Sequence, residues 1–375
     1  MRMLFWLSVI FLLNACVQVY QPGIARNGEA IAAVTPQTPV STVSSSAGSR
    51  PAPPPPSVVA VNTAALPTPL PGSLASRADV QVFIEEMVTN HGFNREELYT
   101  LFSRTRSRDD IIELITRPAE GKPWHAYRKI FLTNARIGGG VAFWNAHRAT
   151  LTRAEQVYGV PAEIIVSIIG VETSYGGNTG IHRVMDALAT LAFDYPRRAD
   201  FFRKELENYL VLTREEGIDP LSLKGSYAGA MGLAQFMPSS YRAYAVDFDA
   251  DQHRNLWTNP TDAIGSVANY LSEHRWQRGQ PIAIPARVSG TQYPALINRK
   301  LETPSLPVSA LRRQGVEPIA PVSDSLTALL LEYDATNGPE YWLGFQNFYV
   351  ITRYNRSKLY AMAVYQLSQE IRRRL

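Results

Sequence analysis

The stretch from Pro161 to Glu172 places one acidic residue at the end of an otherwise mostly apolar segment. Its spacing predicts a helix, because Pro161 is tolerated in a first turn, where the N–H that it lacks has no partner. Isoleucines seven, four and three positions before Glu172 share its helical face. The glycine pair at 176–177 supplies a stop signal, so we expect Glu172 in the last turn of this helix.

Two effects disfavour the ionised form of this carboxyl group. Apolar neighbours desolvate it, and the negative end of the helix dipole repels it, so we expect the pKa of Glu172 to be raised. A carboxylic acid that stays protonated near neutral pH can act as a general acid on an ether-like oxygen. A buried Glu can equally be the structural partner of an arginine, and this helix alone leaves both interpretations open.

The first sixteen residues hold one arginine, an apolar run and the only cysteine, Cys16. The run is short for a bilayer span and typical of a signal-peptide core. The segment 13–16, Leu-Asn-Ala-Cys, resembles a bacterial lipoprotein signal, which implies removal of residues 1–15 and attachment of lipid, including palmitate, to Cys16. An ordinary secretory signal or an anchor helix is the alternative. Val17, rather than Asp, follows the cysteine, which by the same resemblance indicates the periplasmic side of the outer membrane.

The overall charge excludes one class of partner. The chain has 37 basic and 33 acidic residues and a net charge of +4. This mildly basic balance suits a polyanionic wall or a membrane surface, but it is too even to indicate nucleic-acid binding.

Composition divides the chain into segments. Residues 16–76 are rich in Pro, Ser, Thr, Ala and Val and predict a disordered tether, which could also be a mere linker. Helical periodicity dominates 77–280, prolines and short β-prone runs predict a small β-rich insertion at 281–340, and 341–375 returns to helix. The expected fold is mainly α (α+β). Predicted helices lie at about 138–158, 161–175, 184–193, 197–216, 232–245, 260–275 and 354–373.

A glycine-rich segment, residues 225–240, forms a second motif. Its glycines allow close backbone approach. Ser226 and Gln235 offer the neutral hydrogen-bonding groups that a sugar or an acetamido group needs. Alone, such a loop is more often structural than functional.

Together with the segment 172–176, Glu-Thr-Ser-Tyr-Gly, this loop resembles the lytic murein transglycosylases, specifically their membrane-bound B family. Further matches follow in the same order, over 194–198, 255–257, 262–270, 344–349 and 353–355. The resemblance covers roughly 78–374 and implies a lysozyme-like helical catalytic core with an N-terminal helical part.

The resemblance also implies a reaction. The family cleaves the β-1,4 bond between N-acetylmuramic acid (MurNAc) and N-acetylglucosamine (GlcNAc) in peptidoglycan without water, leaving a 1,6-anhydro end. Glu172 would act first as acid and then as base, whereas ordinary glycosidases use two carboxylates. The motif around Glu172 offers neither a partner carboxylate nor a cation. No cofactor is expected for the chemistry.

Several further roles come from the same resemblance. Ser226 and Gln235 would contact glycan near the cleaved bond, and Arg197 and Arg198 would face substrate carboxylates. Groove-lining side chains would be Tyr127, Tyr270, Tyr354 and Asn355. Expected partners are peptidoglycan strands, the outer membrane through the lipid, and wall-synthesis enzymes.

An acidic loop has chemistry of its own. Asp247, Asp249 and Asp251 stand at positions 1, 3 and 5 of an EF-hand pattern, the His253 carbonyl at position 7 and Asn255 at position 9. The loop departs from that pattern at 252, where Gln replaces Gly, and at 258, where Thr replaces the bidentate Glu. A left-handed Gln252 would cost on the order of 1 kcal/mol. We expect Asp262 to close a structural Ca²⁺ or Na⁺ site; a solvated acidic turn is the alternative.

Two rival functions remain at this point. One is a hydrolase that leaves reducing ends, and the other is a non-catalytic peptidoglycan-binding scaffold. The scaffold would tolerate loss of the acid, yet Glu172 is present.

Overall fold

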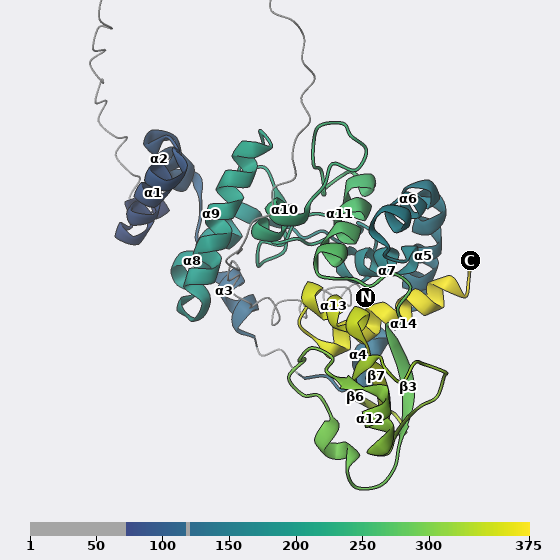
Figure 1. Cartoon of the computed structure of the whole chain (residues 1–375). Helices are drawn as coiled ribbons and strands as arrows, with labels where there is room; N and C mark the ends of the chain where they lie inside the picture. Colours follow the sequence, from purple (N-terminus) through teal and green to yellow (C-terminus); the bar gives the residue numbers. More distant parts are fainter. Residues whose placement is uncertain (1–72, 118–120) are drawn as a thin grey trace, which may run out of the picture. The chain divides into compact units, whose positions relative to one another are not determined.

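Helices dominate the described part of the chain, which in the computed structural model comprises residues 73–117 and 121–375 (Figure 1). The expected signal peptide, Cys16 and nearly all of the expected tether lie outside these residues. The first element of the described residues is a 3₁₀ turn, Leu74–Ser76, in which Leu74 and Ala75 are buried. The predicted boundary at residue 77 is therefore a few residues late, because Leu74 already packs into the core.

The helices follow one another until the sheet region begins. Their bounds are α1 Ala78–His91, α2 Arg95–Arg104, α3 Asp109–Thr116, α4 Trp124–Phe131, α5 Asn134–Ala146, α6 Arg148–Tyr158, α7 Ala162–Thr173, α8 Val184–Asp194, α9 Ala199–Glu215, α10 Pro238–Tyr244 and α11 Pro260–Glu273. Longer connections precede α10 and α11. A two-stranded pair, β1 His182–Arg183 and β2 Lys224–Gly225, connects the start of α8 to the glycine-rich segment.

Two predicted helices differ from the observed ones. The run expected at 138–158 is divided at His147, where φ is −121°, into α5 and α6. The helix expected at 232–245 exists only as α10, because residues 225–236 form turns joined by the isolated bridges Gly225–Met231 and Met231–Phe236.

A five-stranded antiparallel sheet in the order β4-β6-β7-β3-β5 occupies the β-rich region. Its strands are β3 Ala283–Val288, β4 Leu306–Pro307, β5 Val316–Pro318, β6 Thr327–Ala335 and β7 Gly338–Gly344. In the β6–β7 hairpin, Leu330 pairs with Leu343. Both side chains are fully buried in a small core of their own, together with Val308 and Leu311 of α12 (Val308–Arg313). The sheet extends four residues beyond the expected end at 340.

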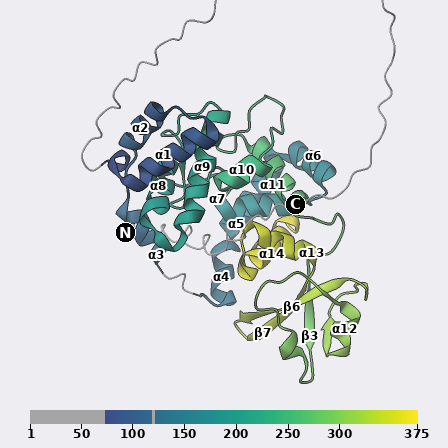
Figure 2. The same ribbon diagram turned by 60° about the vertical axis from the view of Figure 1, so that its left-hand side comes forward.

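The last two helices, α13 (Gln346–Tyr354) and α14 (Lys358–Arg372), return to the helical core. Figure 2 shows α14 beside α5 and α7, with the sheet on the opposite side. Helix α7 is the centre of this core: Ala162 and all residues from Ile164 to Thr173 are buried. Within the described residues no single helix has the length and hydropathy to cross a membrane; α6 and α7, bent by 113°, pass that test only as a pair.

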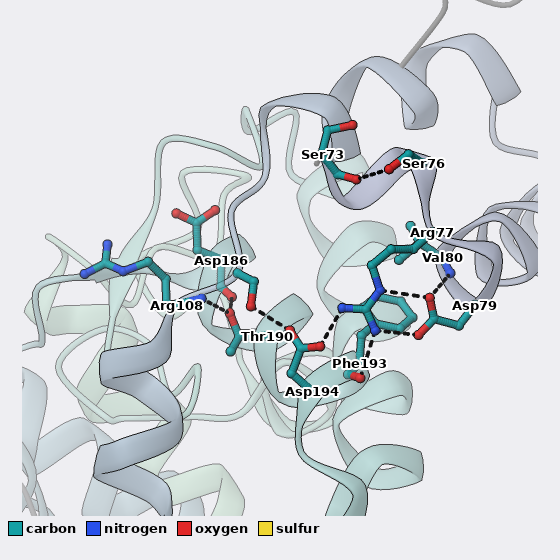
Figure 3. A network of polar contacts seen from close by, with 11 residues as sticks. Ser73, Ser76, Arg77, Asp79, Val80, Arg108, Asp186, Thr190, Phe193 and Asp194 are labelled. Carbon is teal, nitrogen blue, oxygen red and sulfur yellow. Dashed lines mark hydrogen bonds and ion pairs between the residues drawn. The ribbon is translucent and has the colours of Figure 1, made fainter. Parts of the chain in front are cut away.

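A polar network fixes the beginning of α1 to the end of α8 (Figure 3). The Arg77 guanidinium lies 2.5 Å from Asp194 and 2.7 Å from Asp79, and it donates to the Phe193 carbonyl. Ser107 donates to the second oxygen of Asp194. These pairs are partly exposed, so each contributes modestly, but together they fix where the N-terminal segment joins the core.

Candidate active site

Helix α7 carries Glu172 one residue before its end. The helix ends in a left-handed turn at Ser174 (φ 52°) and Tyr175 (φ 63°), so termination occurs two residues before the predicted glycine pair. The N–H groups of Ser174 and Tyr175 donate to the carbonyls of Gly170 and Ile169, which otherwise would have no partner at a helix end. Glu172 is therefore in the last turn, as predicted.

The Glu172 side chain is buried, with 8% of the residue exposed. The hydroxyl of Tyr360 on α14 donates to Oε1 of Glu172 at 2.7 Å, and Oε2 makes no hydrogen bond to any described residue. Burial raises the pKa of Glu172 to about 8, although the Tyr360 hydrogen bond and Arg136 pull it down. Desolvation outweighs both, so the group is mainly protonated at neutral pH. A carboxyl group in this state is a candidate general acid.

The nearby cation was not expected. Arg136 comes from α5, outside the motifs, and its guanidinium donates to the carbonyls of Gly170 and Val171, the latter at 3.3 Å. The sequence motif offers no cation beside Glu172, but the fold supplies one from a separate helix. No other carboxylate among the described residues shifts the pKa of Glu172.

Tyrosines from several elements gather around this carboxyl group. Tyr354 and Tyr360 stack at 6.5 Å with an interplanar angle of 9°, and Tyr270 meets Tyr354 edge-on at 4.9 Å. Tyr127 of α4 is buried close enough for Glu172 to raise the pKa of its phenol. Three of the four predicted groove residues, all of them tyrosines, are thus brought into one cluster with Tyr360.

The hydroxyl groups of this cluster are not all available to a ligand. Tyr354 donates to the Ala234 carbonyl at 2.5 Å and Tyr270 to the Arg353 carbonyl at 2.7 Å. Asn355, the fourth predicted groove residue, is buried directly after α13. A ligand would therefore meet the faces of these tyrosine rings more than their hydroxyl groups.

The glycine-rich segment is fastened to α7 beside Glu172. Thr173 Oγ1 lies 3.0 Å from the Leu233 carbonyl and accepts from the N–H of Gly176. Gly232 has φ 69°, and a Cβ there would collide with the backbone of Leu256. The loop thus needs glycine for both its conformation and its close packing.

Ser226 and Gln235 serve this loop as well. Ser226 Oγ accepts from the N–H groups of Ala228 (3.3 Å) and Ala230 (3.0 Å). The Gln235 amide nitrogen donates to the carbonyls of Thr179 and Gly232, so the amide oxygen is the part left to accept from a ligand. Gln235 also has φ 50°, an uncommon conformation for a residue with a side chain.

The arginine pair lies in a 3₁₀ turn between α8 and α9. Arg197 is exposed. The Arg198 guanidinium covers the rings of Phe201 (4.4 Å) and Phe202 (5.2 Å) and acts electrostatically on Glu205. Neither arginine affects the pKa of Glu172, so the fold does not bring this pair into the cluster around that residue.

The acidic loop does bring three carboxylates together. Oxygens of Asp247, Asp249 and Asp251 lie within 4.8 Å of one another. The carboxylate of Asp247 accepts from the N–H groups of Asp251 and Gln252, which closes the loop. Gln252 has φ 76°, the left-handed conformation predicted for it. Hard carboxylate oxygens at this spacing fit Ca²⁺ chemistry.

Two of the other expected ligands, Asp262 and Asn255, accept hydrogen bonds from backbone N–H groups. Asp262 is fully buried, and its two oxygens accept from the N–H groups of Phe248 and Asn255, both at 2.8 Å. Asp262 is not part of the three-carboxylate group. From its place on α11, its carboxylate instead binds the backbone of the loop. Asn255 Oδ1 accepts from the N–H groups of Trp257 and Thr258, and the His253 carbonyl stays a predicted ligand. Closure of the site by Asp262 is thus not what the geometry favours.

Sequence reasoning missed Tyr360 and Arg136. Tyr360 lies 188 positions from Glu172 and Arg136 lies 34 positions from Gly170. Neither belongs to a motif, and each has the spacing of an ordinary helical residue. Only the packing of α14 and α5 on α7 brings them to the site.

A family model described as the Transglycosylase SLT domain matches residues 75–369. The chain is 47% identical over 310 residues to the membrane-bound lytic murein transglycosylase B of Escherichia coli (strain K12), which covers 80% of this chain and 84% of that protein.

Solved structures agree with this match. The lytic transglycosylase SltB1 of Pseudomonas aeruginosa superposes with a TM-score of 0.77 at 53% identity, covering 80% of this chain and 99% of that one. The Escherichia coli lytic transglycosylase Slt35 in complex with calcium gives 0.74 at 48% identity, covering 80% and 94%. SltB3 of Pseudomonas aeruginosa in complex with NAG-anhNAM-pentapeptide gives 0.71 at 30% identity, covering 78% and 79%.

Proposed function

This chain belongs to the transglycosylase SLT family and is a peptidoglycan lytic transglycosylase, and we propose that it cleaves the MurNAc–GlcNAc β-1,4 bond without water, leaving 1,6-anhydro-MurNAc ends. The observation that carries this proposal is the Glu172 carboxyl group, which is buried, has a raised pKa and has no partner carboxylate among the described residues. One group in that state can give a proton and later take one back.

In the first step Glu172 donates its proton to the glycosidic oxygen as the bond from that oxygen to C1 breaks. The carboxylate that forms is stabilised by the Tyr360 hydroxyl, already 2.7 Å from Oε1, and by the charge of Arg136. The positive charge that develops at C1 is taken up by the acetamido oxygen of the same sugar.

In the second step the Glu172 carboxylate removes the proton from the C6 hydroxyl of the MurNAc ring. The O6–C1 bond forms, the acetamido oxygen leaves C1, and Glu172 is again protonated. No water enters the product. Ordinary glycosidases need a second carboxylate as base or nucleophile, and here the substrate supplies that second group.

A relative supports the form of the product. SltB3 was solved in complex with NAG-anhNAM-pentapeptide, a ligand whose muramic acid is in the anhydro form. We extend this product class to the present chain on the basis of the shared family. A peptide-bearing glycan strand is then the expected substrate.

The roles of the surrounding residues follow from their chemistry. Tyr127, Tyr270 and Tyr354 present ring faces to sugars. Gln235 offers its amide oxygen, and Ser226 shapes the loop that carries Gln235. Asn355 would line the groove with these tyrosines, and Arg197 and Arg198 would face lactyl or peptide carboxylates of the substrate.

The carboxylates of Asp247, Asp249 and Asp251 would hold a structural Ca²⁺, or Na⁺ in its place. The Slt35 structure in complex with calcium supports this assignment. An ion there would reduce the repulsion among the three negative charges. The loop would be stabilised, and no step of the reaction passes through the ion.

The location proposed for the enzyme is the periplasmic side of the outer membrane. Residues 1–15 would be the signal peptide, Cys16 the lipidated residue, and 16–72 the tether that lets the catalytic part reach the wall. The name of the Escherichia coli relative, a membrane-bound enzyme, supports membrane attachment. Wall-synthesis enzymes are the proposed protein partners.

The test is the Glu172→Gln variant, with Glu163→Gln as its matched control. Glu163 lies in the first turn of α7 and is half-buried, so its loss perturbs the same helix away from the site. We expect digestion of purified peptidoglycan to stop in Glu172→Gln and to continue in Glu163→Gln, with anhydro ends detected by mass spectrometry. Continued digestion by Glu172→Gln would refute the proposal, and binding without digestion by the unaltered chain would favour the scaffold.

A further inference from the structure

Two side chains cross between α5 and the carboxyl end of α7 in opposite directions. Arg136 on α5 donates to the carbonyls of Gly170 and Val171 in the last turn of α7. Tyr175, just beyond that turn, donates its hydroxyl to the carbonyl of Arg136 at 2.9 Å. Each segment therefore holds a backbone group of the other, and Glu172 lies between the two points of attachment.

Glycines make room for the Tyr175 ring. A Cβ on Gly139 would lie 2.9 Å from the ring, one on Gly140 would lie 2.6 Å from the hydroxyl, and one on Gly170 would lie 2.5 Å from it. These distances are too short for any larger residue, so the ring fills a slot between α5 and α7 that only glycine permits. Tyr175 also has φ 63°, a conformation that the packed ring holds in place.

Arg136 also places its charge where the helix end is negative. The last carbonyls of α7 carry the negative end of the helix dipole, and a cation there is stabilising. The same charge favours the ionised form of Glu172, in opposition to burial. The Arg136 side chain is half-buried and packs over the ring of Phe131 at 5.3 Å, so solvent screens it only in part.

The other groups around Glu172 are neutral near pH 7. Tyr360 faces it from α14 and Tyr127 from α4, and burial raises the phenol pKa of both. Tyr175, beyond the end of α7, also has a raised phenol pKa. Among the described residues of α6 and α11, which pack on α7 as well, none shifts the pKa of Glu172. Arg136 is thus the cation that acts on Glu172 in the described part of the chain.

We propose that Arg136 and Tyr175 form a reciprocal clamp that fixes the carboxyl end of α7 and keeps Glu172 beside a half-buried positive charge. Both are positioning residues, since they act through Glu172 and its helix. The clamp sets how readily the acid gives up its proton and holds the carboxyl group toward the glycosidic oxygen. This inference rests on the proposed acid role of Glu172.

The charge half of the clamp is tested by titrating Glu172 directly. Carbon-13 NMR of the glutamate side-chain carboxyls, with the Glu172 signal assigned by its loss in Glu172→Gln, gives its titration midpoint without any reaction. We expect Arg136→Gln to move the midpoint up by about one pH unit and Arg136→Lys to keep it near that of the unaltered chain. The alkaline limb of peptidoglycan digestion should move in the same way.

Arg214 provides the matched control. It donates to the His91 carbonyl at 2.8 Å and lies 4.0 Å over the Phe93 ring. These are the same two kinds of contact that Arg136 makes, but they are far from Glu172 in the sequence. Arg214→Gln should leave the midpoint unchanged. An unmoved midpoint in Arg136→Gln, or an equal movement in Arg214→Gln, would overturn the electrostatic role.

The positioning half is tested by Tyr175→Phe, which keeps the ring in its slot and removes only the hydroxyl. We expect roughly a tenfold loss of maximal rate with little change in the Glu172 midpoint. Tyr365→Phe removes a comparable bond, to the Ala283 carbonyl at 3.0 Å, and should leave the rate unchanged. Equal rates in the Tyr175→Phe and unaltered chains would overturn this half. Failure of the proposed reaction would be seen separately, as reducing ends from the unaltered chain.

Discussion

Replacing Tyr360 by Phe removes the hydroxyl that donates to Glu172 while keeping the ring that fills the site. Tyr360 is fully buried and its bond to Oε1 is 2.7 Å long, so water cannot substitute for it. A hydrogen bond to a charged group contributes about 1.5–3 kcal/mol, and one pKa unit corresponds to about 1.4 kcal/mol. The pKa of Glu172, about 8 in the unaltered chain, should therefore rise by roughly one to two units.

The same loss should slow the reaction. Glu172 is protonated before the first step and becomes a carboxylate during it, so the hydroxyl favours the transition state over the ground state. If about half of the charge has developed there, the barrier rises by roughly 1 kcal/mol, and the rate falls roughly five- to tenfold.

The assay is the initial rate of soluble muropeptide release from purified sacculi, measured across pH for both proteins. Tyr360→Phe should lower the plateau and move the alkaline limb to higher pH. Tyr209→Phe is the control, because its side chain is also fully buried and its hydroxyl donates to the Pro220 carbonyl at 2.7 Å, away from Glu172. An alkaline limb that stays in place in Tyr360→Phe would refute the assignment of that limb to Glu172.

Three further outcomes are expected. The pKa of Glu172 is higher in the folded than in the unfolded chain, so its contribution to stability is fully present below about pH 4.5 and is lost as pH rises through about 8. In denaturant titrations the free energy of unfolding of Glu172→Gln should therefore rise relative to that of the unaltered chain over this window, by at most about 5 kcal/mol. A constant difference between the two proteins would contradict the raised pKa. Calcium should raise the melting temperature of the unaltered chain but not that of Asp251→Asn, in which one of the three converging carboxylates is lost, and equal shifts would exclude the loop as the site. Gly232→Ala should lower the melting temperature and the digestion rate together, because a Cβ at φ 69° meets the Leu256 backbone; calorimetry that finds full stability would contradict this.

Local patterns predicted the centre of the molecule well. The helix that carries Glu172, the position of Glu172 in its last turn and the raised pKa are confirmed. These follow from apolar periodicity and neighbouring signals within a dozen residues. The expected family and the mainly α, lysozyme-like fold with a small sheet are confirmed by the comparisons.

Contacts between helices that are distant in the sequence could not be predicted from local patterns. Tyr360 and Arg136 reach Glu172 because α14 and α5 pack on α7, and nothing in their local sequence distinguishes them from surface residues of amphipathic helices. The helix expected at 232–245 was wrong over its first turns for a related reason. Residues 225–236 satisfy their backbone groups through bridges and through contacts with α7, and these contacts outweigh local helical spacing.

The acidic loop was predicted in part by its local pattern and in part depends on tertiary packing. The pattern of alternating aspartates predicted the converging carboxylates and the left-handed Gln252. The pattern could not show that Asp262 satisfies two backbone N–H groups beneath the loop, because that depends on where α11 lies.

The central claim is that a single protonated glutamic acid breaks the glycan without water. Digestion of purified peptidoglycan in water enriched in oxygen-18, followed by mass spectrometry of the released muropeptides, tests it most directly. The account predicts muramic acid ends that are lighter by one water and carry no heavy oxygen. Reducing ends labelled with oxygen-18 would contradict it.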